Sequence, residues 1–118
     1  MATFSKVVLS GSTNGKGIKL ANTATTIHAT GTSSTIIDEL WLYVVNTSSS
    51  VVVCTLTYGG STDPDNYIEQ SIRAESGLYL LLPGLILTGT GSAANTLSGF
   101  GATTNVLVAY GYVNRINP

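Results

Sequence analysis

The side chains that could carry out chemistry in this 118-residue chain are few and lie far apart in the sequence. Cys54 is its single cysteine and His28 its single histidine. A cysteine nucleophile needs a nearby base and a lowered pKa, whereas Cys54 lies in the run Val-Val-Val-Cys-Thr-Leu, where a buried thiol behaves as a small hydrophobic group. A lone histidine in a β-branched segment is typically a surface or hydrogen-bonded structural residue; metal binding or pH sensing is the alternative. A single cysteine also excludes an intrachain disulfide and a zinc site built on cysteines.

The acidic residues do not form a catalytic pair either. Asp38 and Glu39 are adjacent, so in a strand their side chains point to opposite faces and cannot act together as general acid and base. Asp63, Asp65 and Asn66 lie in the polar segment 59–66, but its spacing lacks the glycine and the downstream glutamate of an EF-hand loop. A turn in which these side chains bond their own backbone is favoured. The sequence therefore predicts no enzyme, no cofactor and no metal site.

Two glycine-rich segments resemble nucleotide-binding loops only superficially. Three residues rather than four separate Gly11 from Gly15-Lys16, and a strand rather than a helix is expected to follow, which excludes a phosphate-binding loop. Gly89 and Gly91 form a G-x-G pattern, yet no helical pattern opens after it, so a plain loop is expected there.

The charge content is low and carries its own prediction. Only 9% of residues are charged, against roughly 25% in typical soluble domains, and the mean hydropathy is +0.31. Lys6, Lys16 and Lys19 cluster near the N-terminus, but a net charge of −1 leaves no basic stripe, so direct nucleic-acid binding is not expected. Chains this poor in charge are often subunits that hide surface in an assembly. The alternative is a small monomer with a threonine-rich surface.

Alternation of apolar and polar residues predicts an all-β chain, because no window shows a sustained helical period. Strands are expected at residues 3–9, 18–21, 23–27, 67–72, 78–82, 85–88, 96–100 and 105–113, and as a hairpin over residues 36–58 whose limbs meet at the polar turn 46–50. The Asn14-Gly15 turn predicts a second hairpin that joins 3–9 to 18–21. About nine or ten short strands with Gly, Ser, Thr and Asn turns favour one antiparallel, jelly-roll-like β-sandwich over residues 1–118, ahead of a closed barrel.

The segment 36–58 holds the tryptophan, the cysteine and the densest run of β-branched and aromatic residues, and its first limb is apolar on both faces. One alternation set of that limb holds Leu40, Leu42 and Val44, and the other holds Trp41, Tyr43 and Val45. The return limb has one continuously apolar set, Val52, Cys54, Leu56 and Tyr58, which we assign to the core. A strand that is apolar on both faces expects cover on both, from a second sheet or from a partner.

Three stretches of the chain resemble small virion structural proteins of tailed bacteriophages: TFSKVVLSGSTNGKGIKL, DELWLYVVNTSSSVVV and VLVAYGYVNRI. The resemblance implies a capsid decoration (cement) protein that binds the outer surface of the major capsid protein lattice and stabilises the head. Such proteins are typically small β-domains and often trimers. The resemblance supplies no motif that assigns a role to an individual residue.

The expected partners follow from this resemblance and from the low charge. They are the major capsid protein and further copies of the chain, with a trimer favoured, but neither nucleic acid nor a membrane. No segment approaches the roughly 18 apolar residues of a membrane span, and the N-terminal apolar run is too short for a secretory signal. The expected location is therefore the capsid exterior of the virion, after synthesis in the host cytoplasm.

Interface residues are predicted from face and composition, because aromatic and arginine side chains dominate interface energies. The candidates are Trp41, Tyr43, Tyr110, Tyr112, Arg115 and Lys6. The alternative for each aromatic residue is packing within the core or on a sheet face. A different function is a carbohydrate- or receptor-binding module of a phage fibre or tail, in which Trp41, Tyr43 or Tyr58 would stack on sugar rings.

Overall fold

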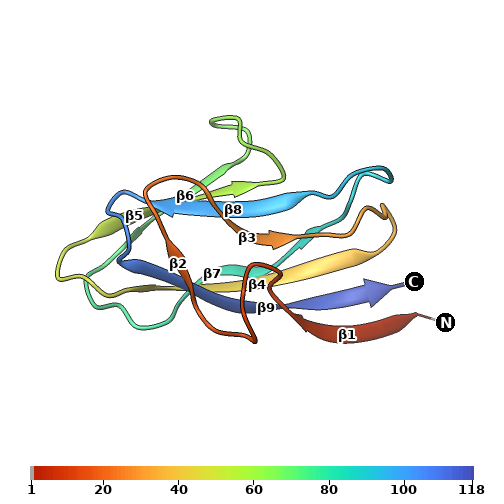
Figure 1. The fold of residues 1–118 in the computed structure, drawn as a ribbon, viewed down its shortest axis with the longest axis horizontal. Coiled ribbons are helices and arrows are strands. Elements are labelled where there is room, and N and C mark those ends of the chain that lie inside the picture. Colours follow the sequence, from red (N-terminus) through yellow and green to blue (C-terminus); the bar gives the residue numbers. More distant parts are fainter. Residues whose placement is uncertain (1) are drawn as a thin grey trace.

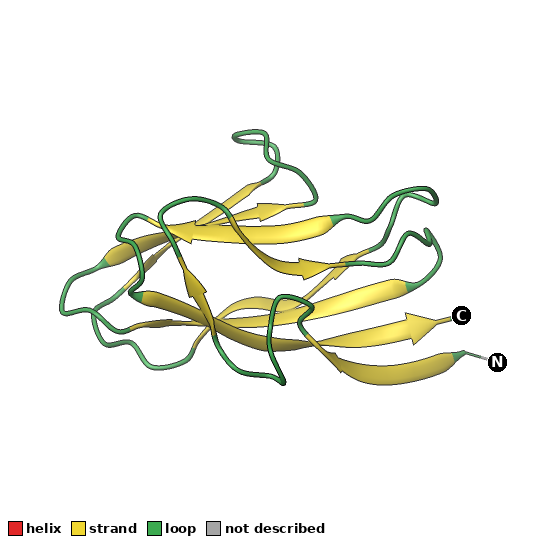
Figure 2. Ribbon diagram, viewed as in Figure 1, coloured by secondary structure: helices red, strands yellow, loops and turns green. Residues whose placement is uncertain are grey.

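The computed structural model describes residues 2–118 as two antiparallel sheets packed face to face (Figures 1 and 2). The five-stranded sheet contains β1 (Thr3–Val8), β2 (Ile18–Leu20), β4 (Ile37–Asn46), β7 (Tyr79–Leu87) and β9 (Leu107–Asn117). The four-stranded sheet contains β3 (Thr25–Ala29), β5 (Val52–Tyr58), β6 (Tyr67–Ile72) and β8 (Thr96–Gly101). Across residues 2–118 no helix is long and apolar enough to cross a bilayer.

The strand order is that of a jelly roll. The first sheet runs β1-β9-β4-β7, with β2 also paired to β9, and the second runs β3-β8-β5-β6. Early strands thus pair with late ones in a nested series: β1 and β2 with β9, β3 with β8, β4 with β7, and β5 with β6. A long antiparallel hairpin that folds over on itself gives this arrangement. The prediction of an antiparallel, jelly-roll-like β-sandwich is confirmed.

The core lies between the sheets and follows the predicted alternation. Leu40, Leu42 and Val44 of β4 are fully buried, and Cys54 and Leu56 of β5 are fully buried as well. Each such aliphatic side chain contributes roughly 1.5–3 kcal/mol by leaving water. The other set of β4, which includes Trp41 and Tyr43, is half-buried and lies on the opposite, outer face of the sheet.

The predicted hairpin between residues 3–9 and 18–21 is wrong. β1 and β2 do not pair with each other; both pair with β9, β2 near its start and β1 near its end. An 11-residue strand is long enough to accept both. The turn at Asn14-Gly15 does form, with φ angles of 57° and 85°. It lies in a loop that contacts β3 of the other sheet, where the Gly11 N–H donates to the Ile27 carbonyl, before the chain returns to the first sheet as β2.

The predicted hairpin over residues 36–58 is also wrong, because β4 and β5 belong to different sheets. The segment between them is a crossover that the buried Asn46 side chain organises. Its Nδ2 donates to the carbonyls of Ser50 and Ile72, at 2.9 Å each, and its Oδ1 accepts from the Ser48 N–H. A polar linker of this length can span the roughly 10 Å between packed sheets, so the turn residues suit a crossover as well as a hairpin.

Other boundaries needed smaller corrections. Residues 78–82 and 85–88 form one strand, β7, rather than two, because register shifts accommodate the Pro83-Gly84 corner on an edge strand. β3 is shifted two residues from the predicted 23–27 and therefore includes His28. The last strand continues to Asn117 instead of ending at residue 113. The predicted strand 67–72 coincides with β6.

Candidate functional site

Five of the six predicted interface residues lie together on the outer face of the five-stranded sheet. They are Lys6 on β1, Trp41 and Tyr43 on β4, and Tyr110 and Tyr112 on β9. The register places Trp41 opposite Tyr112 and Tyr43 opposite Tyr110. Residues more than 60 positions apart in sequence thus form one surface, which the second sheet does not cover.

The aromatic pair on this face has a defined geometry. The rings of Trp41 and Tyr112 are nearly parallel, with an interplanar angle of 11° and centroids 6.3 Å apart. The Lys6 ammonium lies 4.7 Å from the centroid of the Tyr112 ring, a cation–π contact. Gly84 of β7 has a φ of 85° and passes so close to the indole of Trp41 that a β-carbon there would crowd it. Glycine at this position lets the indole lie against β7.

A polar row crosses the same face. Lys6 pairs in register with Asn114, and Asn114 pairs with Glu39. The Oε1 atom of Glu39 accepts from Trp41 Nε1 at 2.7 Å and from Asn114 Nδ2 at 3.0 Å. These hydrogen bonds, from Asn114 and from Trp41, lower the pKa of Glu39, so its carboxylate stays ionised. Lys6, Asn114 and Glu39 line an open cavity of about 320 Å³ together with Phe4, Ser5 and Ile116.

The β7 edge adds exposed apolar side chains to this face and its border. β7 is the last strand of the sheet, and the chain has no charged residue from position 76 to position 114. We call the exposed hydrophobic residues of this region, with the neighbouring tyrosines of β4 and β9, the apolar band. It consists of Tyr43, Leu78, Tyr79, Leu80, Leu85, Ile86 and Tyr110.

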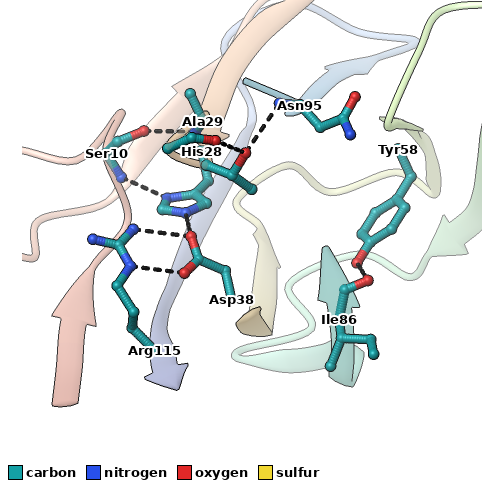
Figure 3. A network of polar contacts seen from close by, with 10 residues as sticks. Ser10, His28, Ala29, Asp38, Tyr58, Ile86, Asn95 and Arg115 are labelled. Carbon is teal, nitrogen blue, oxygen red and sulfur yellow. Dashed lines mark hydrogen bonds and ion pairs between the residues drawn. The ribbon is translucent and has the colours of Figure 1, made fainter. Parts of the chain in front are cut away.

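Arg115, the sixth predicted interface residue, points the other way. Its guanidinium makes a two-pronged contact with Asp38, with Nε 2.7 Å from Oδ1 and Nη2 2.9 Å from Oδ2 (Figure 3). His28 reaches the same carboxylate, with Nε2 2.8 Å from Oδ2. The structure therefore separates Arg115 from the other five candidates.

Ser10, His28 and Asp38 lie next to one another, but their bonds differ from those of a hydrolytic triad. The backbone N–H of Ser10 donates to His28 Nδ1, so Nε2 carries the ring proton and donates to Asp38 (Figure 3). The Ser10 hydroxyl oxygen instead accepts from the N–H of Ala29. His28 is fully buried with both nitrogens occupied. This cluster connects the β1–β2 loop, β3, β4 and β9, and so joins the two sheets.

Asp38 is buried, yet its carboxylate stays ionised because of its two partners. Burial raises the pKa of its carboxyl group, but the hydrogen bonds and charges of Arg115 and His28 outweigh that effect and hold the pKa below its ordinary value. Sequence reasoning missed this cluster. The available signal was that Asp38 shares an alternation set with the core residues Leu40 and Leu42, so a buried carboxylate needed a partner.

The remaining candidates have structural surroundings. Cys54 is buried, and burial raises the pKa of its thiol to about 12, as expected of an inert core thiol. Tyr58 donates its hydroxyl proton to the Ile86 carbonyl at 2.8 Å and so ties the two sheets together (Figure 3). In loop 59–66, Asn66 bonds the backbone of Thr62 and Tyr58, as a turn residue does. Among residues 2–118 no group of three or more His, Cys, Asp or Glu side chains could hold a metal ion.

No protein-family model matches the chain, and no curated protein is significantly similar to it.

The first prediction concerns the buried cluster. We expect Asp38→Asn to lower the free energy of unfolding by about 3 kcal/mol, because it leaves Arg115 and His28 without their shared carboxylate. Urea denaturation followed by tryptophan fluorescence measures the change. Asp65→Asn, in the exposed loop 59–66, is the control and should change stability little. A loss below about 1 kcal/mol for Asp38→Asn would contradict the role assigned to the cluster.

The second prediction concerns pH. The pKa of Asp38 is lower in the folded protein than its ordinary value of 3.8, so the folded state holds fewer protons in acid than the unfolded state. The stabilisation is therefore complete above pH 3.8 and is lost as the pH falls through the folded pKa. Melting temperatures of the wild type should fall steeply in that acid range. Asp38→Asn should melt at a lower temperature near neutral pH and flatten the acid dependence, and an unchanged acid profile would refute the assignment.

Proposed function

We propose that this protein is a structural component of a tailed-bacteriophage virion, a capsid decoration protein that binds the outer surface of the major capsid protein lattice and stabilises the head. The observation that carries the proposal is the apolar band, an exposed surface along one edge and one face of the sandwich whose own residues are all uncharged. Exposed apolar patches of this kind mark protein contacts. The resemblance of the sequence to small virion proteins supplies the class of partner.

The physical basis would be many small contacts. Each apolar Å² removed from water contributes roughly 25 cal/mol, and a lattice presents many equivalent sites. Tyrosines at the centre of such a contact supply large buried area at low cost in side-chain entropy. Jelly rolls occur in viral capsid proteins, and also in lectins, so the fold agrees with the proposal without deciding it.

A carbohydrate- or receptor-binding module of a phage fibre or tail is the second candidate. The nearly parallel rings of Trp41 and Tyr112 favour it, because aromatic rings on the face of a β-sandwich can stack on sugars. Tyr58 lies apart from these two rings, on β5 of the four-stranded sheet, and its hydroxyl donates to the Ile86 carbonyl. Binding to phage capsids that lack decoration protein tests the first candidate, and binding to glycans tests the second.

The third prediction tests the apolar band with a matched pair of substitutions. Leu80 is 41% exposed on the apolar band, and Val53 is 38% exposed on the outer face of the other sheet. We expect Leu80→Ser to reduce occupancy on undecorated phage shells by at least about tenfold, because it removes apolar area from the contact. Val53→Ser should leave occupancy unchanged, and neither variant should lower the melting temperature by much.

Shell occupancy is measured by cosedimentation and by imaging of the decorated particles, which also locates the bound protein. Wild-type occupancy for Leu80→Ser would show that the contact does not use the apolar band. Absence of any binding to shells would refute the decoration proposal itself.

The fourth prediction concerns self-association. With only 9% charged residues and an apolar edge strand, the chain is expected to form a closed oligomer, and the resemblance to small virion proteins favours a trimer. Light scattering at micromolar concentration should therefore give three times the monomer mass of 12.2 kDa. A monomeric mass under these conditions would contradict it.

A further inference from the structure

The cavity on the outer face is lined by Ser5 and by members of two registered rows of side chains, Phe4 with Ile116 and Lys6 with Asn114 and Glu39. The polar row Lys6, Asn114 and Glu39 lies between two apolar rows. One apolar row contains Phe4, Ile116 and Ile37, and the other contains Val8, Tyr112 and Trp41. A polar stripe within an apolar surface is costly to cover with an apolar partner, because its groups would lose water without gaining hydrogen bonds. The cavity therefore requires a different occupant from the apolar band.

The hydrogen-bonding groups of the polar row are partly used and partly free. Trp41 and Asn114 both donate to Oε1 of Glu39, which fixes the carboxylate in position. Among the described residues, no hydrogen bond engages Oε2 of Glu39 or Oδ1 of Asn114, and Lys6 contacts the Tyr112 ring but no carboxylate. The cavity thus presents two acceptors and one ammonium donor to a ligand.

The charges of the row select the class of ligand. Lys6 and Glu39 lie on strands separated by β9, about 10 Å apart by strand spacing. A net anion that spans the row would be repelled by the carboxylate of Glu39, and a net cation that spans it would be repelled by the ammonium of Lys6. A neutral ligand with several hydroxyl groups satisfies both, since each hydroxyl both donates and accepts. The Phe4 ring, which is 72% exposed, and Ile116 can pack against its C–H groups.

We propose that this cavity binds a neutral saccharide. Its volume of about 320 Å³ lies at the lower end of the usual range for small-molecule sites, which suits a terminal sugar unit. The site uses β1 and the ends of β4 and β9 near both chain termini (Figure 1), whereas the apolar band centres on β7. It does not depend on capsid binding, but many copies on one particle would strengthen a weak affinity.

The test begins with the purified full-length protein on an array of neutral, sialylated and sulfated oligosaccharides. The tightest neutral glycan is then titrated by calorimetry. We expect binding to neutral glycans, and about a tenfold or greater loss of affinity in both Glu39→Gln and Phe4→Ala, which remove a charged acceptor and the apolar wall. Phe4 is largely exposed, so the second variant tests the site without disturbing the fold.

Matched controls are Glu75→Gln, an exposed carboxylate elsewhere, and Val51→Ala, an exposed apolar residue at 62%. Both should bind the glycan as the wild type does. Binding restricted to anionic glycans, no binding of neutral glycans at millimolar concentration, or binding insensitive to the two cavity variants would each overturn the proposal. Shell binding measured in parallel keeps the two proposals separate, because glycan binding without shell binding would contradict only decoration.

Discussion

The contact of the Asp38 carboxylate with Arg115 and His28 is the interaction on which the packing of β3 against the start of β4 and the end of β9 depends. A buried carboxylate costs several kcal/mol to remove from water, and that cost is offset only if its partners hold their geometry. Here the partners come from β3 and β9, and the Ser10 backbone in turn holds the imidazole. The Asp38 carboxylate therefore links strands of both sheets, directly or through His28, with the loop between β1 and β2.

The inward orientation of Asp38 also determines which side chains of β4 and β9 lie on the outer face. Asp38 pairs in register with Arg115, and the next pair along the strands is Glu39 with Asn114. Because side chains alternate between faces, the first pair points into the protein and the second points out. Two adjacent carboxylates thus have different roles: one joins the sheets, and the other lines an open cavity. Arg115 is used inside, which leaves Lys6 as the cation beside that cavity.

Sequence reasoning succeeded where the signal was local and failed where it was not. The strands, the buried set of β5 and the two apolar sets of β4 follow from alternation, which neighbouring residues reveal. Strand pairing does not follow from alternation. Asp38 and Arg115 are 77 residues apart, and neither segment contains a pattern that predicts its pairing with the other. Both predicted hairpins were wrong because polar turn residues do not specify how the next strand pairs: segment 46–50 crosses between the sheets, and the loop between β1 and β2 joins two strands that both pair with β9. The aromatic face could be predicted by composition, but its polar row required the register of three strands.

The β7 edge indicates how this surface can associate without indiscriminate aggregation. An edge strand with exposed leucines is an aggregation hazard, since its free backbone groups can pair with any other strand. Pro83 removes one donor, and the register shifts beside it and near Leu81 distort the edge, so strand addition is disfavoured. The apolar side chains remain exposed all the same. In the proposed decoration function, association through this region depends on side-chain packing against a complementary and preformed surface, which the ordered capsid lattice would present at every repeat.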